Sequence, residues 1–216
     1  MIATQRIQHQ TAASSPHFAV IDVETTGLDP TATRMIEIAI VEVDRFGRRI
    51  DEFSTLLDIP GDEPLGAEFI HRISRQMLDT APRFDEVIGS ICAHLAGRIV
   101  VGHVVEFDIG HLGEEFARAG LELPRLRESA LCTRDLAYLL LPPGPKTLGA
   151  CCEAVGIENE AAHTALGDAR ATTELLFALL AHGHDARLEA LAEAATALTW
   201  PVFDDLMRPL EHLLPR

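Results

Sequence analysis

The sequence has little positive charge. Its 216 residues include 18 Lys and Arg against 33 Asp and Glu, which gives a formal net charge of −15 at pH 7, and Lys146 is the only lysine. Proteins that grip long nucleic acids through phosphate contacts usually carry basic stripes. The composition therefore argues against an extended nucleic-acid groove, and any nucleic-acid partner is expected to be held locally, at a short segment or an end.

Long apolar runs and paired cysteine motifs are also missing. No apolar run approaches the ~20 residues that cross a bilayer, so no membrane partner is expected. Residues 1–15 are polar and lack the apolar stretch of a secretory signal, which predicts a disordered tail and a cytoplasmic protein. No Cys-x-x-Cys spacing occurs, so reduced thiols are expected rather than a structural zinc site; the cysteines are Cys92, Cys132, Cys151 and Cys152.

An apolar run that ends in acidic residues is the clearest feature that is present. Residues 18–21 are rich in β-branched and aromatic side chains and predict a buried strand, with Asp22 and Glu24 at its end. Because side chains alternate across a strand, these two carboxylates project to one face. Their repulsion requires a raised pKa or a divalent cation. The alternative is a strand that ends at a polar turn, with both side chains solvated.

The rest of the chain predicts a mixed sheet flanked by helices, that is, an α/β fold. Two strands follow the first as an antiparallel meander and a third returns through a helix as a parallel strand; they are expected at residues 35–43, 50–57 and 98–102. Short helices are expected within residues 65–80, with a cap at Ser74. A longer helix presents Ile109, Leu112 and Phe116, and others are expected at residues 83–95, 148–155, 164–181, 188–198 and 202–214.

Two later stretches place acidic residues where a strand or loop passes into a helix. Asp108 falls in a first helical turn, where the helix dipole alone favours Asp. His163 and Asp168 are five residues apart, about 140° around a helix, so they cannot share one helical face. They can meet at one site if His163 lies on the entering loop and Asp168 on the second turn.

Together these stretches resemble the three motifs of the DEDDh 3′-to-5′ exonucleases, a group that includes the proofreading epsilon subunit of bacterial DNA polymerase III and ribonuclease T. The resemblance spans roughly residues 18–181 and implies a ribonuclease H-like fold and a two-metal phosphodiesterase. We therefore expect an exonuclease domain at residues 16–183 and a helical extension at residues 184–216. The motifs read Asp22-Val23-Glu24-Thr25-Thr26-Gly27-Leu28, His103-x-x-x-Phe107-Asp108 and His163-x-Ala165-x-x-Asp168.

The resemblance also implies roles for these residues. His163 would be the general base, since a His with a pKa near ~6.5 can take a proton from water at neutral pH. Two magnesium or manganese ions ~4 Å apart would stabilise the attacking and leaving oxygens, with release of a nucleoside 5′-monophosphate. The implied metal-binding carboxylates are Asp22, Glu24, Asp108 and Asp168.

The loop after the first motif is expected to contact the terminal nucleotide. Gly27 would let the backbone approach the sugar, and Leu28 would press on the last base. His71 and Phe107 are further candidates, for which ordinary packing is an equal alternative. Family members often carry Asn where this chain has Val104, which puts a polar contact or a substrate preference in doubt but removes no metal ligand. The expected loop contacts are Thr25, Thr26, Gly27 and Leu28.

The leading hypothesis is a metal-dependent exonuclease that acts on the 3′ end of single-stranded or frayed DNA or RNA, with DNA favoured and a polymerase or repair protein as a candidate partner. DNA proofreading or repair, RNA end-trimming and degradation of short oligonucleotides stay open, as does the oligomeric state. A non-catalytic scaffold that docks through its C-terminal helices is the alternative from another class. Retention of His163 and the carboxylates argues against it. A phosphatase or phosphodiesterase for a small nucleotide is a third option. The dependence of activity on substrate length would distinguish it from an exonuclease.

Overall fold

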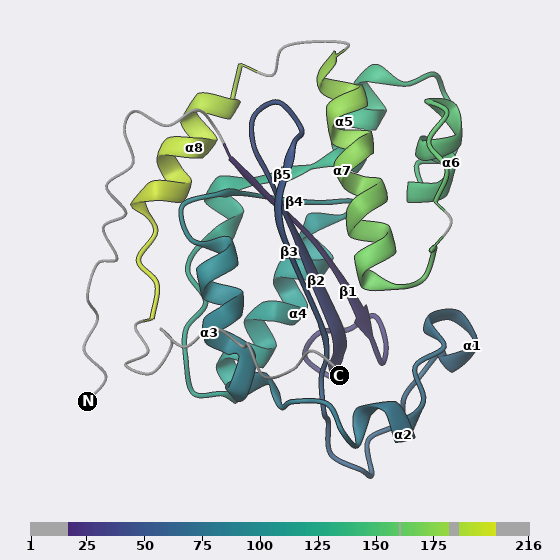
Figure 1. Cartoon of the computed structure of the whole chain (residues 1–216), viewed down its shortest axis with the longest axis vertical. Helices are drawn as coiled ribbons and strands as arrows, with labels where there is room; N and C mark the ends of the chain where they lie inside the picture. The colour runs from purple at the N-terminus through teal and green to yellow at the C-terminus, as the bar shows by residue number, and fades with distance from the viewer. Residues whose placement is uncertain (1–16, 160, 182–185, 202–216) are drawn as a thin grey trace.

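A five-stranded mixed sheet forms the centre of the protein (Figure 1). The computed structural model describes residues 17–159, 161–181 and 186–201. The strand order is β3-β2-β1-β4-β5; β1, β2 and β3 are antiparallel neighbours, and β4 and β5 run parallel to β1. The strands are β1 (Phe18–Thr25), β2 (Met35–Val43), β3 (Arg49–Leu56), β4 (Ile99–Gly102) and β5 (Ala130–Cys132).

Helices cover both faces of this sheet. In Figure 1, α3 (Phe84–Leu95) and α4 (Val105–Arg118) lie on one face, and α5 (Thr133–Leu140), α6 (Leu148–Ala154) and α7 (Ala165–Ala181) lie on the other. The short helices α1 (Glu68–His71) and α2 (Arg75–Leu78) lie beyond one end of the sheet. A 3₁₀ turn, η1 (Leu126–Ser129), precedes β5, and α8 (Leu188–Ala197) packs against η1 and β4.

The alternation of β1 divides the apolar core into two layers. Ala19, Ile21 and Val23 pack against α3 and α4, whereas Phe18 and Val20 pack against the α7 side. Side chains two residues apart share a face of a strand. Asp22 and Glu24 therefore continue the series that faces α7.

The structure confirms the predicted α/β class, and β2 has the bounds that the sequence indicated. It also adds η1 and β5, which were not predicted, because β5 has only three residues and so shows too little alternation to be recognised. Ser74 is the residue before α2, but its side chain makes no capping hydrogen bond. The tail expected at residues 1–15 and the helix expected at residues 202–214 lie outside the described residues.

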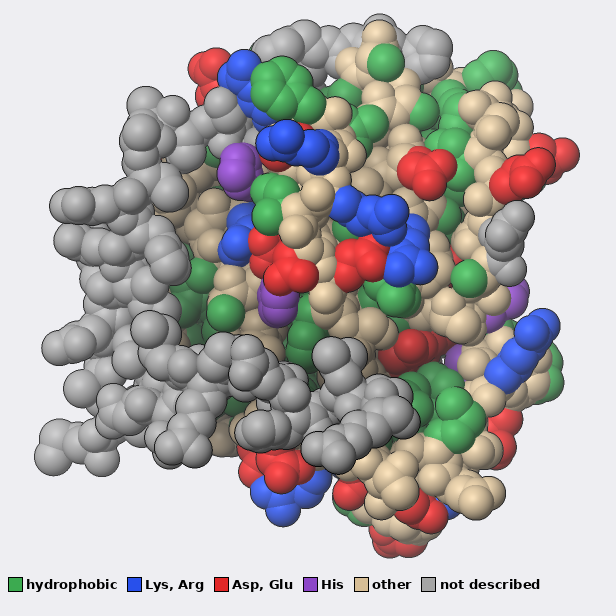
Figure 2. Space-filling model, in the orientation of Figure 1, with side chains coloured by type: hydrophobic (Ala, Val, Ile, Leu, Met, Phe, Trp, Pro, Cys, Tyr) green, Lys and Arg blue, Asp and Glu red, His purple; other side chains and the backbone are tan. Residues whose placement is uncertain are grey.

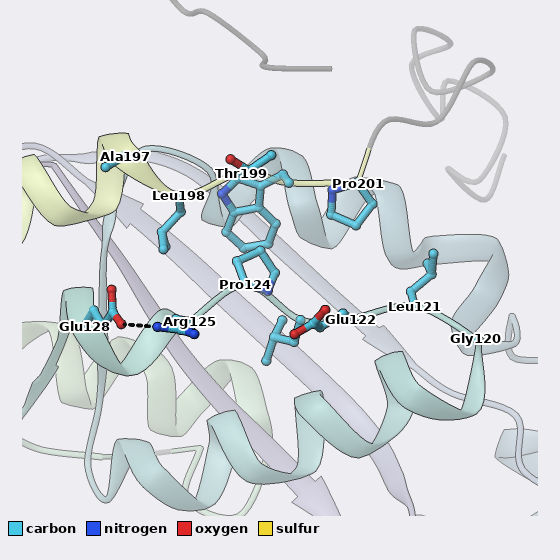
Figure 3. A pocket seen from close by; sticks show the side chains of 12 residues that line it. Gly120, Leu121, Glu122, Pro124, Arg125, Glu128, Ala197, Leu198, Thr199 and Pro201 are labelled. Carbon is cyan, nitrogen blue, oxygen red and sulfur yellow. Dashed lines mark hydrogen bonds and ion pairs between the residues drawn. The ribbon is translucent and has the colours of Figure 1, made fainter. Parts of the chain in front are cut away.

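The segment after α8 returns to the core. Trp200 is only 4% exposed and packs with the α3 and α4 layer. A groove of about 560 Å³ runs between residues 120–125 and residues 197–201 (Figure 3). All four cysteines are free thiols, and no helix in the described ranges is long and apolar enough to cross a membrane.

Candidate active site

Three carboxylates meet where the central strand ends. Asp22 and Glu24 project from β1 towards α7, and Asp168 lies in the first turn of α7. One oxygen from each side chain lies within 4.8 Å of the others. The period of the strand thus brings the two β1 carboxylates to one face, as predicted, and α7 supplies the third.

Asp108 reaches the same strand from the opposite face. Its side chain is 5% exposed in the first turn of α4 and accepts a hydrogen bond from the backbone N–H of Val23, between Asp22 and Glu24. A Cβ atom on Gly102 would lie 2.9 Å from Oδ2 of Asp108. The glycine at the end of β4 therefore leaves the space that this carboxylate occupies.

His163 lies on the loop that enters α7, in the left-handed region with φ of 67°. Its backbone N–H donates a hydrogen bond of 3.2 Å to Oδ2 of Asp168, and its side chain is exposed. The amide of Asn159 donates to Oδ1 of the same carboxylate over 2.5 Å. His163 and Asp168 are therefore brought together, although Asp168 lies in the first turn of the helix rather than in the predicted second turn.

Glu37 is a further carboxylate of this region, and it was not among the predicted site residues. It lies opposite Glu24 in the β1–β2 register, and its Oε2 accepts a hydrogen bond of 3.0 Å from the backbone N–H of Ala165. Its presence within the buried strand β2 was the available signal, because a carboxylate in a buried apolar run needs a partner. The strand beside β1 thus holds the start of α7.

The crowded carboxylates favour protonation unless a cation is present. Burial, and then the charge of Asp108, raises the pKa of Asp22 well above its usual value. Burial, with the charges of Asp168 and Glu37, raises the pKa of Glu24 to about 7, and burial also raises the pKa of Asp108. Desolvation and like charges both penalise the ionised form. This electrostatic arrangement fits a divalent cation, which would compensate the same charges.

The donor set also fits magnesium or manganese. Carboxylate oxygens are the ligands that these hard cations prefer, and the site offers oxygens from Asp22, Glu24 and Asp168, with Asp108 beside them. No cysteine takes part. The residues present therefore fit a divalent magnesium or manganese ion.

The predicted nucleotide loop contacts α4 and the segment before α1. Leu28 is 85% exposed at its tip, and Nε2 of His111 on α4 lies 3.1 Å from Oγ1 of Thr33, at the end of the loop. The ring of Phe107 lies against His111, with 4.3 Å between their centroids. Gly66, with φ of +74°, approaches the Thr26 backbone so closely that a Cβ atom there would lie 2.1 Å from the Thr26 oxygen.

His71 is placed differently from an exposed contact residue. It is 4% exposed; Nδ1 accepts from the backbone N–H of Ile73, and Nε2 lies 3.1 Å from the carbonyl oxygen of Leu65. Both ring nitrogens therefore hold the loop around α1 together. Its substrate contact stays a prediction, as do the contacts expected of Phe107 and of Thr25, Thr26, Gly27 and Leu28.

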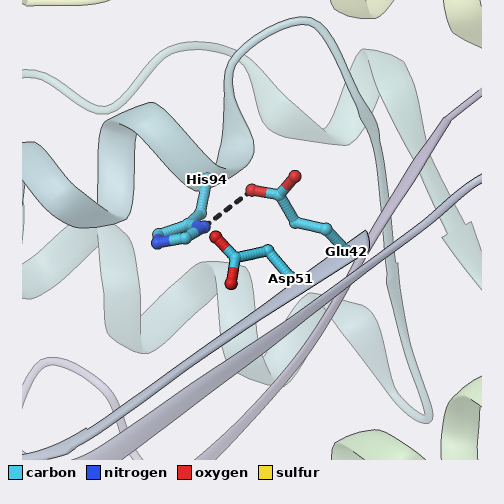
Figure 4. A group of neighbouring side chains, drawn as sticks. All are labelled: Glu42, Asp51 and His94. Carbon is cyan, nitrogen blue, oxygen red and sulfur yellow. Dashed lines mark hydrogen bonds and ion pairs between the residues drawn. The ribbon is translucent and has the colours of Figure 1, made fainter. Parts of the chain in front are cut away.

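A second group of metal-ligating side chains lies elsewhere, on β2, β3 and α3. Glu42, Asp51 and His94 come within 4.8 Å of one another (Figure 4). The carboxylate of Glu42 is bonded to Nδ1 of His94 and to Arg98, each at 2.6 Å. Because the Arg98 guanidinium already compensates this buried charge, we interpret the group as a structural ion pair.

The sequence relatives of this chain include two DNA polymerase III proteins. The chain is 34% identical over 166 residues to a DNA polymerase III of the PolC type from Bacillus cereus, a match that covers 76% of this chain but 11% of that polymerase. It is 32% identical over 164 residues to the DNA polymerase III subunit epsilon of Aquifex aeolicus, which covers 76% of this chain and 80% of that subunit.

A solved structure has the same fold. The structure described as "3'-end specific recognition of histone mRNA stem-loop by 3'-exonuclease" superposes with a TM-score of 0.68 at 15% identity, over 79% of this chain and 84% of the other. The fold is therefore ribonuclease H-like, with carboxylates at the end of the central strand. Because residues 19–176 match the family model of the exonucleases of the ribonuclease T type, the chain belongs to that family. The predicted resemblance and the predicted class of enzyme, an exonuclease, are confirmed.

Proposed function

We propose that this exonuclease removes nucleotides from the 3′ end of single-stranded or frayed nucleic acid and releases nucleoside 5′-monophosphates. The observation that carries the proposal is the meeting of Asp22, Glu24 and Asp168 within 4.8 Å, with Asp108 against the same strand. Four carboxylates at one strand end serve no packing purpose, because their like charges destabilise the metal-free fold. They suit a reaction at a phosphodiester.

Each residue has a distinct role in this reaction. Divalent magnesium or manganese ions held by Asp22, Glu24, Asp108 and Asp168 would supply two positive centres that stabilise the attacking and leaving oxygens of an in-line displacement. His163, exposed at the edge of the carboxylate cluster, accepts a proton from the attacking water. The bond from the terminal phosphorus to the 3′ oxygen breaks, and that oxygen takes up a proton.

Features of the loop and of the surface favour binding of only the few nucleotides at the 3′ end of the nucleic acid. Leu28 is exposed at the tip of the loop after β1, where it would press on the terminal base. The backbone at Thr26 and Gly27 would approach the sugar of the same nucleotide. On the face in Figure 2, basic and acidic side chains are interspersed in small groups, without a continuous basic stripe among the described residues. Such a surface suits a frayed end rather than a long tract.

DNA is the favoured substrate, and a polymerase is the favoured partner. Both sequence relatives are named as DNA polymerase III proteins, and the epsilon subunit matches over 80% of its own length. A cytoplasmic location goes with this role. The solved 3′-exonuclease structure concerns a histone mRNA, so the experiment below includes RNA.

Matched 5′-labelled single-stranded DNA and RNA oligonucleotides test the proposal. The protein is incubated with each strand in magnesium, manganese or a chelator, alongside His163→Ala and a control variant, His17→Ala, which alters an exposed His at the start of β1. We expect a metal-dependent ladder that shortens from the 3′ end, is stronger with DNA, and is lost in His163→Ala but retained in His17→Ala. Absence of cleavage with both strands and both metals, or full activity of His163→Ala, would overturn the mechanism.

A further inference from the structure

Three arginines from different elements line one small pocket beside α4. The pocket measures about 150 Å³, and its walls include Arg127 from η1, Arg134 from α5 and Arg187 at the start of α8. The positive charge of these guanidinium groups contrasts with the net charge of −15 for the whole chain. A local gathering of arginines in an acidic protein indicates a site for an anion.

Three helices also begin at this pocket. Val104, Cys132 and Arg187 are the N-cap residues of α4, α5 and α8, all three line the pocket, and none of the three helices has a side-chain cap. The first backbone N–H groups of a helix have no partner within it, and the helix dipole adds partial positive charge there. Three such ends at one pocket favour a negatively charged group.

One buried donor of the pocket has no acceptor. Nε of Arg134 is inaccessible to solvent and has no hydrogen-bond partner in the described part of the chain. A buried N–H without a partner is costly, so a bound oxygen would stabilise it. Glu106 and Asp135 also line the pocket, but Glu106 is paired with Arg127 at 2.6 Å, and Asp135 is exposed. The unpartnered Nε of Arg134 is therefore the donor that a bound anion would satisfy.

The pocket and the candidate active site share the first turn of α4. Val105 and Glu106, which line it, belong to the same first turn of α4 as Asp108. The charges of Arg134 and of Asp168 both act on His103, the residue before Val104. An anion held here would thus lie at the same end of α4 as Asp108.

We infer that this arginine pocket binds a phosphate group of the substrate strand, upstream of the phosphodiester that is cleaved. The inference rests on the proposed function, because the strand must end at the carboxylates. A free nucleoside 5′-monophosphate has the same chemistry and is the other source of such a group. The strand is favoured because the pocket and Asp108 share one helical turn.

Kinetics with two substrates test this inference. One is a single-stranded DNA decanucleotide, and the other is the p-nitrophenyl ester of thymidine 5′-monophosphate, which has one phosphodiester and no upstream phosphate. For Arg134→Gln, and separately for Arg187→Gln, we expect the ratio of kcat/KM for the decanucleotide to kcat/KM for the ester to fall about tenfold, as for loss of one charge-assisted contact. The control is Arg125→Gln, which alters an exposed arginine outside this pocket.

Salt dependence separates phosphate binding from a merely structural role. Each phosphate contact with a single strand contributes about 0.7 to the slope of log affinity against log salt. The slope of log KM for the decanucleotide should fall by about this amount in Arg134→Gln and recover in Arg134→Lys. An unchanged ratio and slope in both pocket variants, or equal losses with the two substrates, would overturn the inference.

Two further outcomes are distinguishable. If thymidine 5′-monophosphate raises the Tm of the wild-type protein but not of Arg134→Gln, while the decanucleotide ratio is unchanged, the pocket binds free monophosphate and the strand assignment is wrong. If the wild-type protein hydrolyses neither substrate, the proposed function has failed. Binding of a fluorescent decanucleotide in magnesium then tests the pocket alone, and equal affinity of the wild-type protein and Arg134→Gln would overturn it.

Discussion

Glu37 on β2 accepts a hydrogen bond of 3.0 Å from the backbone N–H of Ala165, the first residue of α7. The bond joins residues that are 128 positions apart in the chain. It connects the strand beside β1 to the helix turn that carries Asp168 and to the loop that carries His163. The geometry of the site therefore depends on a side chain that holds no place in the recognised motifs.

Loss of this hydrogen bond should reduce turnover. We expect Glu37→Ala to lower kcat about tenfold, because the start of α7 loses the acceptor that holds it, while Glu37→Gln keeps an acceptor oxygen and retains most of the activity. Steady-state kinetics on a labelled DNA oligonucleotide in magnesium would measure both variants. A Gln variant as impaired as the Ala variant would show that the charge of Glu37, rather than its hydrogen bond, matters.

The metal-free protein should become more stable as the pH falls. The pKa of Glu24 in the folded state is about 7, and those of Asp22 and Asp108 are also raised. Such groups take up protons on folding between the unfolded carboxyl pKa of about 4 and the raised folded values. In a chelator, we therefore expect a higher Tm at pH 6 than at pH 8, from scanning calorimetry.

Magnesium should reverse this trend, because it binds the ionised carboxylates and stabilises the folded state by an amount that grows with the ratio of its concentration to its Kd. The increase in Tm on adding magnesium should be larger at pH 8 than at pH 6. Asp22→Asn should raise the metal-free Tm at pH 8 and reduce the effect of magnesium. A metal effect of equal size in wild type and variant would place the cation elsewhere.

The space that Gly102 leaves for Asp108 gives another test. A Cβ atom at position 102 would lie 2.9 Å from Oδ2 of Asp108 and 3.0 Å from Cα of Val105, so the carboxylate must move. Because a displacement of about 1 Å at a reacting centre can cost about a hundredfold, Gly102→Ala should lower kcat by about that factor. Gly149→Ala is the matched control, since a Cβ atom there meets nothing within 4 Å. Equal activity of the two variants would show that the space at Gly102 is not needed for catalysis.

The period of β1 was sufficient to predict that Asp22 and Glu24 share a face. The resemblance to the exonuclease motifs, rather than a local pattern, implied that Asp108 and Asp168 lie near them. Glu37 escaped prediction because its role comes from the β1–β2 register, which no local pattern specifies.

Loop geometry accounts for other differences. Asn159 reaches Asp168 through a loop rather than through a helical or strand period. The burial of His71 likewise follows from the way the segment around α1 folds on itself. In each case the deciding contact joins residues whose separation along the chain carries no periodic signal.

Val104 gives the last prediction, because it stands where family members often carry Asn. Its φ is 133° at the N-cap of α4, in the positive range that β-branched residues rarely adopt and in which Asn occurs several-fold more often than most residues. Relief of such backbone strain stabilises a protein by about 1 kcal/mol. Val104→Asn should therefore raise the free energy of unfolding by about 1 kcal/mol in urea denaturation, whereas Val104→Ala should not, since Ala also avoids positive φ. A lower stability of the Asn variant would mean that the apolar packing of Val104 outweighs its backbone strain.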